Sequence, residues 1–159
     1  MTMKGAIQVI MAMLFLMIFT FCAWYEGSEI LDNPWEWEYS TPFSELLHTQ
    51  VEGPEDISNL DYFVYAAKFR PLFPALMMLT LLYLVTLTGL TVSKGSQKKS
   101  AFFLTGLGVL LLLMSGLIWS SPTVGGHFFK GISLILGIVS ILVGMLYYFK
   151  WTPTSKRVA

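Results

Sequence analysis

The chain has 159 residues, of which 55% are hydrophobic and 13% are charged, with a formal net charge of zero and one cysteine. Globular domains carry roughly 25% charged residues, so a water-soluble fold of this size would have too much apolar surface to bury, and the composition indicates a membrane protein. The single cysteine, Cys22, excludes an intramolecular disulfide and any Cys-x-x-Cys redox or metal motif.

The zero net charge conceals a strong partition along the chain. All ten acidic residues lie between Glu26 and Asp61, and residues 26–70 contain only two basic residues, Lys68 and Arg70. This segment therefore has a net charge of −8, from ten acids against two bases, while the rest of the chain has eight bases and no acid. In a membrane chain, such sorting is a topology signal.

Four apolar segments are long enough to cross a bilayer. The first, residues 5–24, contains no charged residue, and a helix of about 20 residues spans the roughly 30 Å hydrocarbon core. It exceeds the roughly 7–15 apolar residues of a signal peptide, so we expect a retained helix. The others are residues 72–92, 101–119 and 131–149. None of the four contains Asp, Glu, Lys, Arg or His, which argues against a proton relay, an ion pathway or a buried haem site.

Residues 26–70 are predicted to form an acidic, aromatic-rich outer loop domain of short helices with one short strand. Its centre alternates aromatic and acidic side chains: Trp35, Glu36, Trp37, Glu38 and Tyr39. This period-two pattern is typical of a half-buried strand with its rings in one stripe, and the same pattern would lay three rings on the membrane interface. We take these five residues as the candidate partner surface, because aromatic residues anchor binding surfaces. The alternative is that the stripe of rings is structural and packs over the mouth of the bundle or against Tyr62 and Phe69.

Two helices are predicted in the same segment. Thr41 and Pro42 indicate the start of a short helix over residues 43–48, with a capping hydroxyl followed by proline. Residues 56–69 have helical apolar spacing, and Ser58 with Asp61 resembles a capping box with Asp in place of Glu. We expect this second helix to be amphipathic and to lie at the membrane interface.

The basic residues predict the orientation. With the amino end inside, the inner face holds Lys4, Lys94, Lys98, Lys99, Lys150, Lys156 and Arg157. The outer face holds Lys68, Arg70 and Lys130. Seven against three is a positive-inside bias, so we expect cytoplasmic termini and an extracytoplasmic position for residues 26–70.

Small residues recur on the fourth span. Four of them are candidate helix-packing residues: Ser133, Gly137, Ser140 and Gly144. They include two small-xxx-small pairs, a spacing that lets helix backbones approach closely. The third span offers a facing set: Gly106, Gly108, Ser115 and Gly116. Packing within one four-helix bundle and self-association both remain open as explanations.

The sequence offers no catalytic constellation, phosphate loop or nucleic-acid patch, so we expect neither an enzyme nor a nucleic-acid partner. His48 and His127, with Glu45 or Glu52, have the ligand chemistry of a zinc site, but nothing in their spacing enforces one. We therefore predict no catalytic residue, no metal and no cofactor. The short basic clusters beside the spans are explained by anionic membrane lipid.

The run Trp24–Glu29 and the following run Leu31–Trp37 resemble a family of small uncharacterised bacterial membrane proteins, the YjdJ type, from spore-forming Gram-positive bacteria. The resemblance covers the first span and the start of the acidic segment. It implies bacterial origin and residence in the cell inner membrane. Because the family has no assigned activity, it transfers no catalytic residue.

We therefore expect an all-α, multi-pass integral membrane protein with four transmembrane helices in a four-helix bundle. Its predicted role is that of a non-enzymatic binding, assembly or accessory module that presents an acidic aromatic outer surface. The expected partners are membrane lipid, another membrane protein or further copies of the chain. The alternative is a small-solute channel or transporter subunit formed by oligomerisation.

Overall fold

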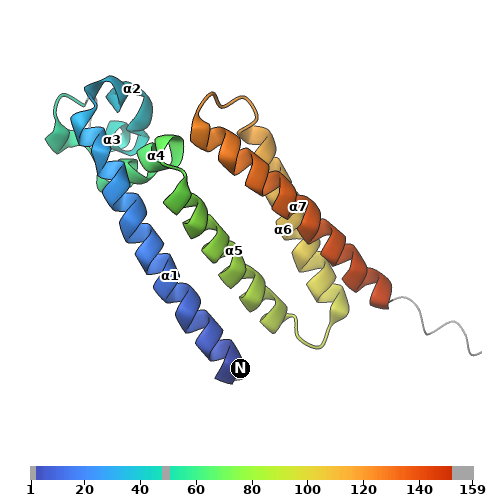
Figure 1. The fold of residues 1–159 in the computed structure, drawn as a ribbon. Coiled ribbons are helices and arrows are strands. Elements are labelled where there is room, and N and C mark those ends of the chain that lie inside the picture. The colour runs from blue at the N-terminus through green and yellow to red at the C-terminus, as the bar shows by residue number, and fades with distance from the viewer. Residues whose placement is uncertain (1–2, 48–50, 152–159) are drawn as a thin grey trace, which may run out of the picture.

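The structure, a computed structural model, describes residues 3–47 and 51–151. In these ranges the regular elements are the helices α1 (Met3–Gly27), α2 (Trp37–Ser40), α3 (Pro42–Leu47), α4 (Asn59–Phe69), α5 (Leu72–Val92), α6 (Gln97–Leu117) and α7 (Val124–Trp151) (Figure 1). Three short 3₁₀ segments join them: Ser28–Asp32, Pro34–Glu36 and Pro54–Asp56. The all-α prediction is confirmed for the described part of the chain.

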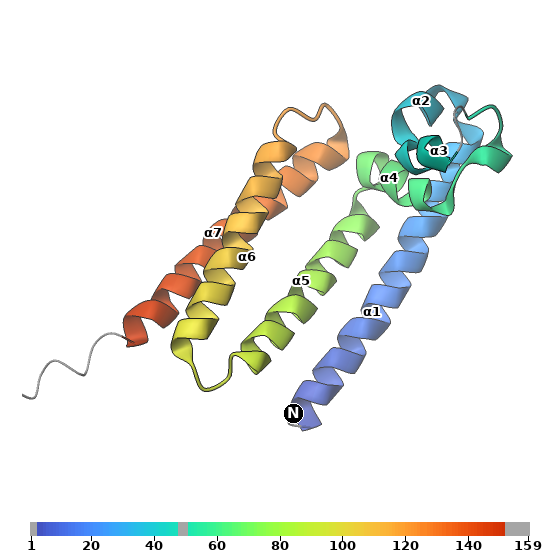
Figure 2. The same cartoon turned by 180° about the vertical axis from the view of Figure 1, so that it is seen from behind.

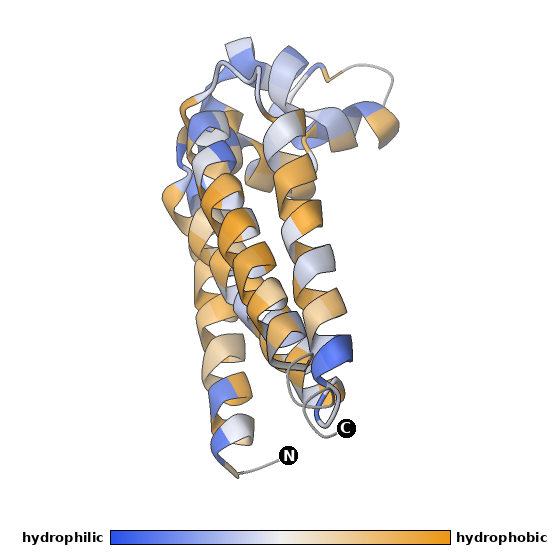
Figure 3. Ribbon diagram, turned by 90° about the vertical axis from the view of Figure 1, so that its right-hand side faces the viewer, coloured by the Kyte–Doolittle hydropathy of each residue, from blue (hydrophilic) through white to orange (hydrophobic). Residues whose placement is uncertain are grey.

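Four segments are long and apolar enough to cross a membrane: Met3–Asp32, Leu72–Val92, Gln97–Leu117 and Val124–Phe149. Figure 3 shows hydrophobic residues along the long helices, with hydrophilic residues gathered towards their ends. Three of the four predicted apolar segments lie within these spans, whereas the predicted segment 101–119 runs two residues past the end of α6 at Leu117. The lengths match the hydrocarbon thickness, since about 20 helical residues reach roughly 30 Å.

Polar caps explain why α6 and α7 begin before the predicted apolar segments. The Ser96 hydroxyl accepts a hydrogen bond from the backbone N–H of Lys99, at 3.4 Å, and starts α6 at Gln97. The Thr123 hydroxyl accepts one from the N–H of Gly126, at 3.0 Å, ahead of α7. Hydropathy marks where a helix becomes apolar, whereas the cap decides where it begins.

The four long helices are arranged as two antiparallel pairs, α1 with α5 and α6 with α7 (Figures 1 and 2). The pairs contact each other directly near one end, and α4 contacts α7 near the other. At one end the ring of Phe103 lies over Gly89, where an added Cβ would come within 2.1 Å of it. At the other, the carbonyl oxygen of Ala67 lies against Gly125, and a Cβ there would come within 1.6 Å. The molecule thus has two pairs joined near their ends, where the sequence predicted one four-helix bundle.

Small residues on both helices form the α6–α7 contact. The buried residues of α6 include Ala101, Leu104, Gly108, Leu111 and Ser115. Their spacing alternates between three and four, the heptad pattern of helices that cross at a shallow, left-handed angle. Together with the short side chains, this spacing lets the two backbones approach along most of their length.

The four small residues predicted on the fourth span can now be located. A Cβ on Gly137 would lie 3.0 Å from the carbonyl oxygen of Gly108, and one on Gly144 would lie 3.1 Å from that of Ala101. Ser133 is fully buried, and Ser140 is half-buried. On the facing helix, Gly108 and Ser115 lie in the contact, whereas a Cβ on Gly106 or Gly116 would meet nothing within 4 Å.

Candidate functional site

The acidic segment, residues 26–70, folds into a small helical head at one end of the long helices (Figure 1). Its core is formed by four buried apolar side chains: Ile30, Ile57, Tyr62 and Tyr65. The ring of Tyr62 lies 5.9 Å from that of Trp24 on α1, measured between ring centroids. A Cβ on Gly27 would lie 1.9 Å from the carbonyl oxygen of Tyr62. Only glycine permits this approach, so α4 lies directly against the end of α1.

The predicted strand in the aromatic–acidic run is wrong. Pro34–Glu36 forms a 3₁₀ turn and Trp37–Ser40 forms α2. Proline at the first position favours the turn, whose backbone is closed by a hydrogen bond from Glu36 N–H to the carbonyl of Asn33, at 3.1 Å. Alternation over five residues is too short a pattern to outweigh this local bonding, and a strand needs a neighbouring strand to pair with.

The three rings of the predicted partner surface, Trp35, Trp37 and Tyr39, therefore do not form one stripe. A helical residue turns by about 100° relative to its neighbour, so side chains two positions apart point to nearly opposite faces of the helix. Trp37 packs against the head core and donates from Nε1 to the carbonyl of Ile30, at 2.9 Å. Trp35 is 87% exposed and Tyr39 is 67% exposed. Glu38 is also exposed, whereas Glu36 is half-buried and accepts a hydrogen bond from Ser40 Oγ.

A buried carboxylate joins α3 to α4. Asp61, which is fully buried, accepts hydrogen bonds from the backbone N–H groups of Phe43, at 2.9 Å, and Ser44, at 2.8 Å, and from the Ser44 hydroxyl. It thereby satisfies the free N–H groups at the start of α3. Such a charge is stable in the interior only because these donors replace water.

Asp61 corrects two sequence predictions. The predicted helix over residues 43–48 corresponds to α3, but its cap is Asp61, since the Thr41 hydroxyl donates to the carbonyl of Trp37 instead. The proposed capping box is half formed: Ser58 caps α4 through Leu60 N–H, at 3.3 Å, while Asp61 turns away to α3. Local spacing finds caps within one helix and misses those between helices.

The two basic residues of the head have different surroundings. Arg70 donates from Nε and Nη2 to the Glu29 carboxylate, both at 3.2 Å. These hydrogen bonds, and then the charge of Glu29, raise the pKa of the Arg70 guanidinium above its ordinary value. Lys68 donates from Nζ to the carbonyl of Tyr39 and to Ser40 Oγ, at the carbonyl end of α2, where a cation is stabilised.

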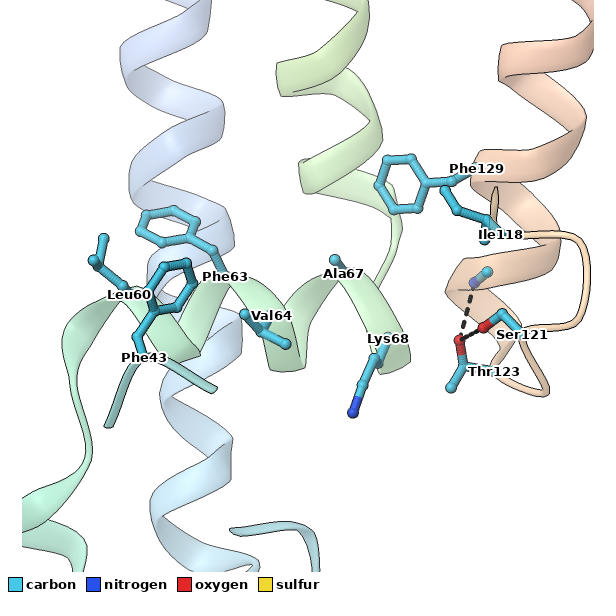
Figure 4. Close-up of a pocket in the computed structure, with 11 residues that line it drawn as sticks. Phe43, Leu60, Phe63, Val64, Ala67, Lys68, Ile118, Ser121, Thr123 and Phe129 are labelled. Atoms are coloured by element: carbon cyan, nitrogen blue, oxygen red, sulfur yellow. Dashed lines mark hydrogen bonds between the residues drawn. The ribbon is translucent and has the colours of Figure 1, made fainter. Parts of the chain in front are cut away.

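A groove lies where the head meets the turn between α6 and α7 (Figure 4). Its volume is about 490 Å³, and its lining residues include Phe43, Phe63, Val64, Lys68, Ser121, Thr123 and Phe129. Sequence reasoning missed this groove, because its lining combines α4 with residues that follow α6, far away in the sequence. The adjacent Gly125 and Gly126 were the available signal, since paired glycines often mark a close backbone approach.

A second cavity, of about 540 Å³, opens on the acidic side of the head and is lined partly by Glu38, Glu45 and Glu52. Within residues 3–47 and 51–151, no group of three or more His, Cys, Asp or Glu side chains could hold a metal ion. His127 is exposed, and His48 lies outside the described residues. The histidine–carboxylate combination considered from the sequence therefore gains no support from the described part of the chain.

Comparison with known proteins identifies the first part of the chain. A family model described as "Domain of unknown function (DUF4306)" matches residues 6–93. The chain is also 39% identical over 88 residues to "Uncharacterized protein YjdJ" of Bacillus subtilis (strain 168), an alignment that covers 52% of this chain and 81% of that protein. No solved structure matches the chain. The family match ends at Ser93, directly after α5, so α6 and α7 lie beyond it.

Proposed function

The chain belongs to the DUF4306 family, and from this premise we propose that it is a multi-pass membrane protein that acts as a non-enzymatic binding or assembly module. The resemblance to YjdJ-type proteins is confirmed by the relative from Bacillus subtilis. Membrane residence is supported by four helices long and apolar enough to span a bilayer. Outside these helices, the head supplies the chain's only acidic surface.

In the proposed orientation, the head faces outward and both termini face the cytoplasm. The head and the α6–α7 turn lie at one end of the long helices, and the start of α1 and the α5–α6 turn lie at the other (Figure 1). Lysines gather at this second end: Lys4, Lys94, Lys98 and Lys99. The positive-inside rule therefore supports a cytoplasmic position for that end and an outer position for the acidic head.

Cysteine labelling in a Cys22→Ser background tests this orientation. Cysteines introduced at Glu52 in the head and Val124 at the start of α7 should react with an impermeant maleimide added to intact cells. A cysteine at Ser96, in the α5–α6 turn, should react only after the cells are opened. Labelling of the Ser96 position in intact cells would contradict the orientation.

The binding role rests on one observation. Trp35 and Tyr39 are exposed, whereas other aromatic residues of the head are packed in its core. Trp35 is 87% exposed and Tyr39 is 67% exposed, whereas Tyr62 is 8% and Tyr65 is 6% exposed. Burying a large aromatic side chain is favourable, and aromatic residues are enriched at the centres of interfaces. In Figure 1, α2 lies on the side of the head away from the long helices, which favours a protein partner over the membrane interface.

A pair of variants separates binding from folding. The double variant Trp35→Ala/Tyr39→Ala should keep wild-type thermal stability and should lose any protein that co-purifies with the wild type from the native membrane. Trp37→Ala should instead lower the stability, because it removes a packed ring and the hydrogen bond to Ile30. Leu46→Ala, at an 82% exposed position, is the matched control that should change neither property.

Two outcomes would contradict this role. A partner retained in full by Trp35→Ala/Tyr39→Ala would exclude these rings as its anchors. A chain that assembles only with its own copies, unaffected by the double variant, would instead favour the alternative of a channel or transporter subunit formed by oligomerisation.

A further inference from the structure

We propose that the groove between α4 and the α6–α7 turn binds one anionic phospholipid from the outer leaflet, with its phosphate at Lys68. The acyl part would lie against the apolar wall formed by Phe63, Val64 and Phe129. This inference rests on the membrane residence and the orientation proposed above, but it is independent of the partner surface at Trp35 and Tyr39.

The first argument is the direction in which the groove changes polarity. Figure 4 shows the rings of Phe63 and Phe129 directed towards the long helices, while Lys68 points away from them. Ser121 and Thr123 lie on the same polar side, on the turn before α7. A phospholipid in a bilayer has this arrangement, with its chains towards the membrane centre and its phosphate at the surface.

The second argument is charge complementarity. Among the described residues the one ion pair joins Arg70 to Glu29, so Lys68 has no carboxylate within ion-pair distance. Its ammonium group donates to two neutral oxygens, on Tyr39 and Ser40. Because an ammonium has three N–H donors, one remains for a ligand. A phosphate would supply the missing negative charge and a charge-assisted hydrogen bond.

The position of the groove favours a lipid over a second protein chain. The groove lies where α4, an amphipathic helix across the end of the spans, meets α7, at the depth where lipid headgroups would lie in the proposed orientation (Figure 4). Neighbouring lipid is always present there at high local concentration.

Native mass spectrometry of the detergent-purified full chain tests the proposal, with phosphatidylglycerol and phosphatidylcholine of identical acyl chains as probes. The wild type should retain one phosphatidylglycerol per chain in preference to phosphatidylcholine. Lys68→Met should weaken phosphatidylglycerol binding by about tenfold, the size expected for one charge-assisted hydrogen bond, and remove the preference. Lys68→Arg should preserve it. Lys130→Met, at a lysine 4.8 Å from the Trp119 ring centroid and outside the groove, is the charge control.

A second variant tests the apolar wall without touching the charge. Val64→Trp should fill the groove and weaken the binding of both lipids, whereas Val92→Trp, at an 86% exposed position on α5, should bind as the wild type does. This variant is needed because Lys68→Met also removes the hydrogen bond to Tyr39 and loosens α2.

Three results would overturn the proposal. They are equal binding of the two lipids by the wild type, unchanged phosphatidylglycerol binding in both Lys68→Met and Val64→Trp, and a lipid-free dimer that Val64→Trp dissociates. Trp35→Ala/Tyr39→Ala should retain the lipid, so failure of the partner surface and failure of the lipid site are distinguishable.

Discussion

The head of the family region and the α6–α7 pair are packed mainly by different means. In the head, large side chains form the core: aromatic residues and isoleucines fill it, and the buried Asp61 joins two helices, although Gly27 also permits one close backbone approach. In the α6–α7 pair, the contacts come from the absence of side chains, at Gly108, Gly137 and Gly144. The head packs large residues around a core, whereas the pair packs backbone against backbone.

This difference follows from the solvent proposed for each region. A head in water gains free energy when apolar surface is buried, so large side chains stabilise it. Between helices surrounded by lipid, that driving force is absent, and association depends on close van der Waals contact, which small residues permit. The groove lies where these two kinds of packing meet, and Gly125 brings the α7 backbone against the end of α4.

The largest effect is expected for the polar contact that joins α3 to α4. Asp61→Ala removes an acceptor from two backbone N–H groups and one hydroxyl, and leaves those donors buried. We expect a loss of about 3 kcal/mol in the free energy of unfolding, because hydrogen bonds to a charged group contribute roughly 1.5–3 kcal/mol and buried orphan donors add to the loss. Urea titration in mild detergent, followed by tryptophan fluorescence, measures it.

The matched control is Asp32→Ala, at an exposed aspartate of the same head. It should change the free energy of unfolding by less than about 0.5 kcal/mol, as is usual for exposed positions. Equal losses in the two variants would show that Asp61 acts through net charge alone. The polar contact between α3 and α4 would then not distinguish the head from the α6–α7 pair.

A smaller effect is expected in the α6–α7 pair. Gly137→Leu forces a large side chain into a site where even a Cβ would lie 2.9 Å from Leu112. We expect a loss of about 2 kcal/mol, within the range for overpacked interiors. Gly106→Leu introduces the same side chain on α6 where nothing lies within 4 Å, and it should be close to neutral. If Gly137→Leu leaves the monomer stable and dissociates an oligomer, the glycine serves self-association instead.

Sequence reasoning worked best where one periodic pattern decides the structure. The apolar segments lead directly to the four long helices, and the residues of α5 agree with the prediction because both of its ends coincide with polar or proline residues. Ser133, Gly137 and Gly144 could be proposed as packing residues because a small residue every three or four positions is visible along one helix.

It failed where the outcome depends on residues far apart in the sequence. The Asp61 contact crosses 17 residues to Ser44 and has no local signature, so a local capping box was predicted in its place. The aromatic–acidic run was interpreted as a strand, because nothing local shows that Trp37 would bond to the carbonyl of Ile30 and turn the run into helix. The groove needs both α4 and the α6–α7 turn, whose approach depends on the fold as a whole.

The smallest effect is expected for the exposed ion pair within the family region. The side chains of Arg70 and Glu29 are 55% and 48% exposed, so water screens their attraction. Glu29→Gln should lower the thermal midpoint by at most about 2 °C, and the difference should shrink further in 1 M salt. Thermal unfolding in detergent at low and high salt measures both quantities.

Arg70→Gln should have the larger effect of the two, and the reason lies in a neighbouring carboxylate. One oxygen of Glu26 is buried with no hydrogen-bond partner among the described residues, and the charge of Glu26 also acts on Arg70. When Glu29 is removed, Arg70 can turn to Glu26, whereas removal of Arg70 takes away the cation on which the charge of Glu26 acts. A double-mutant cycle over Glu29 and Arg70 isolates their coupling. A larger loss for Glu29→Gln than for Arg70→Gln would exclude this exchange of partners, and the ion pair would then be the sole role of Arg70.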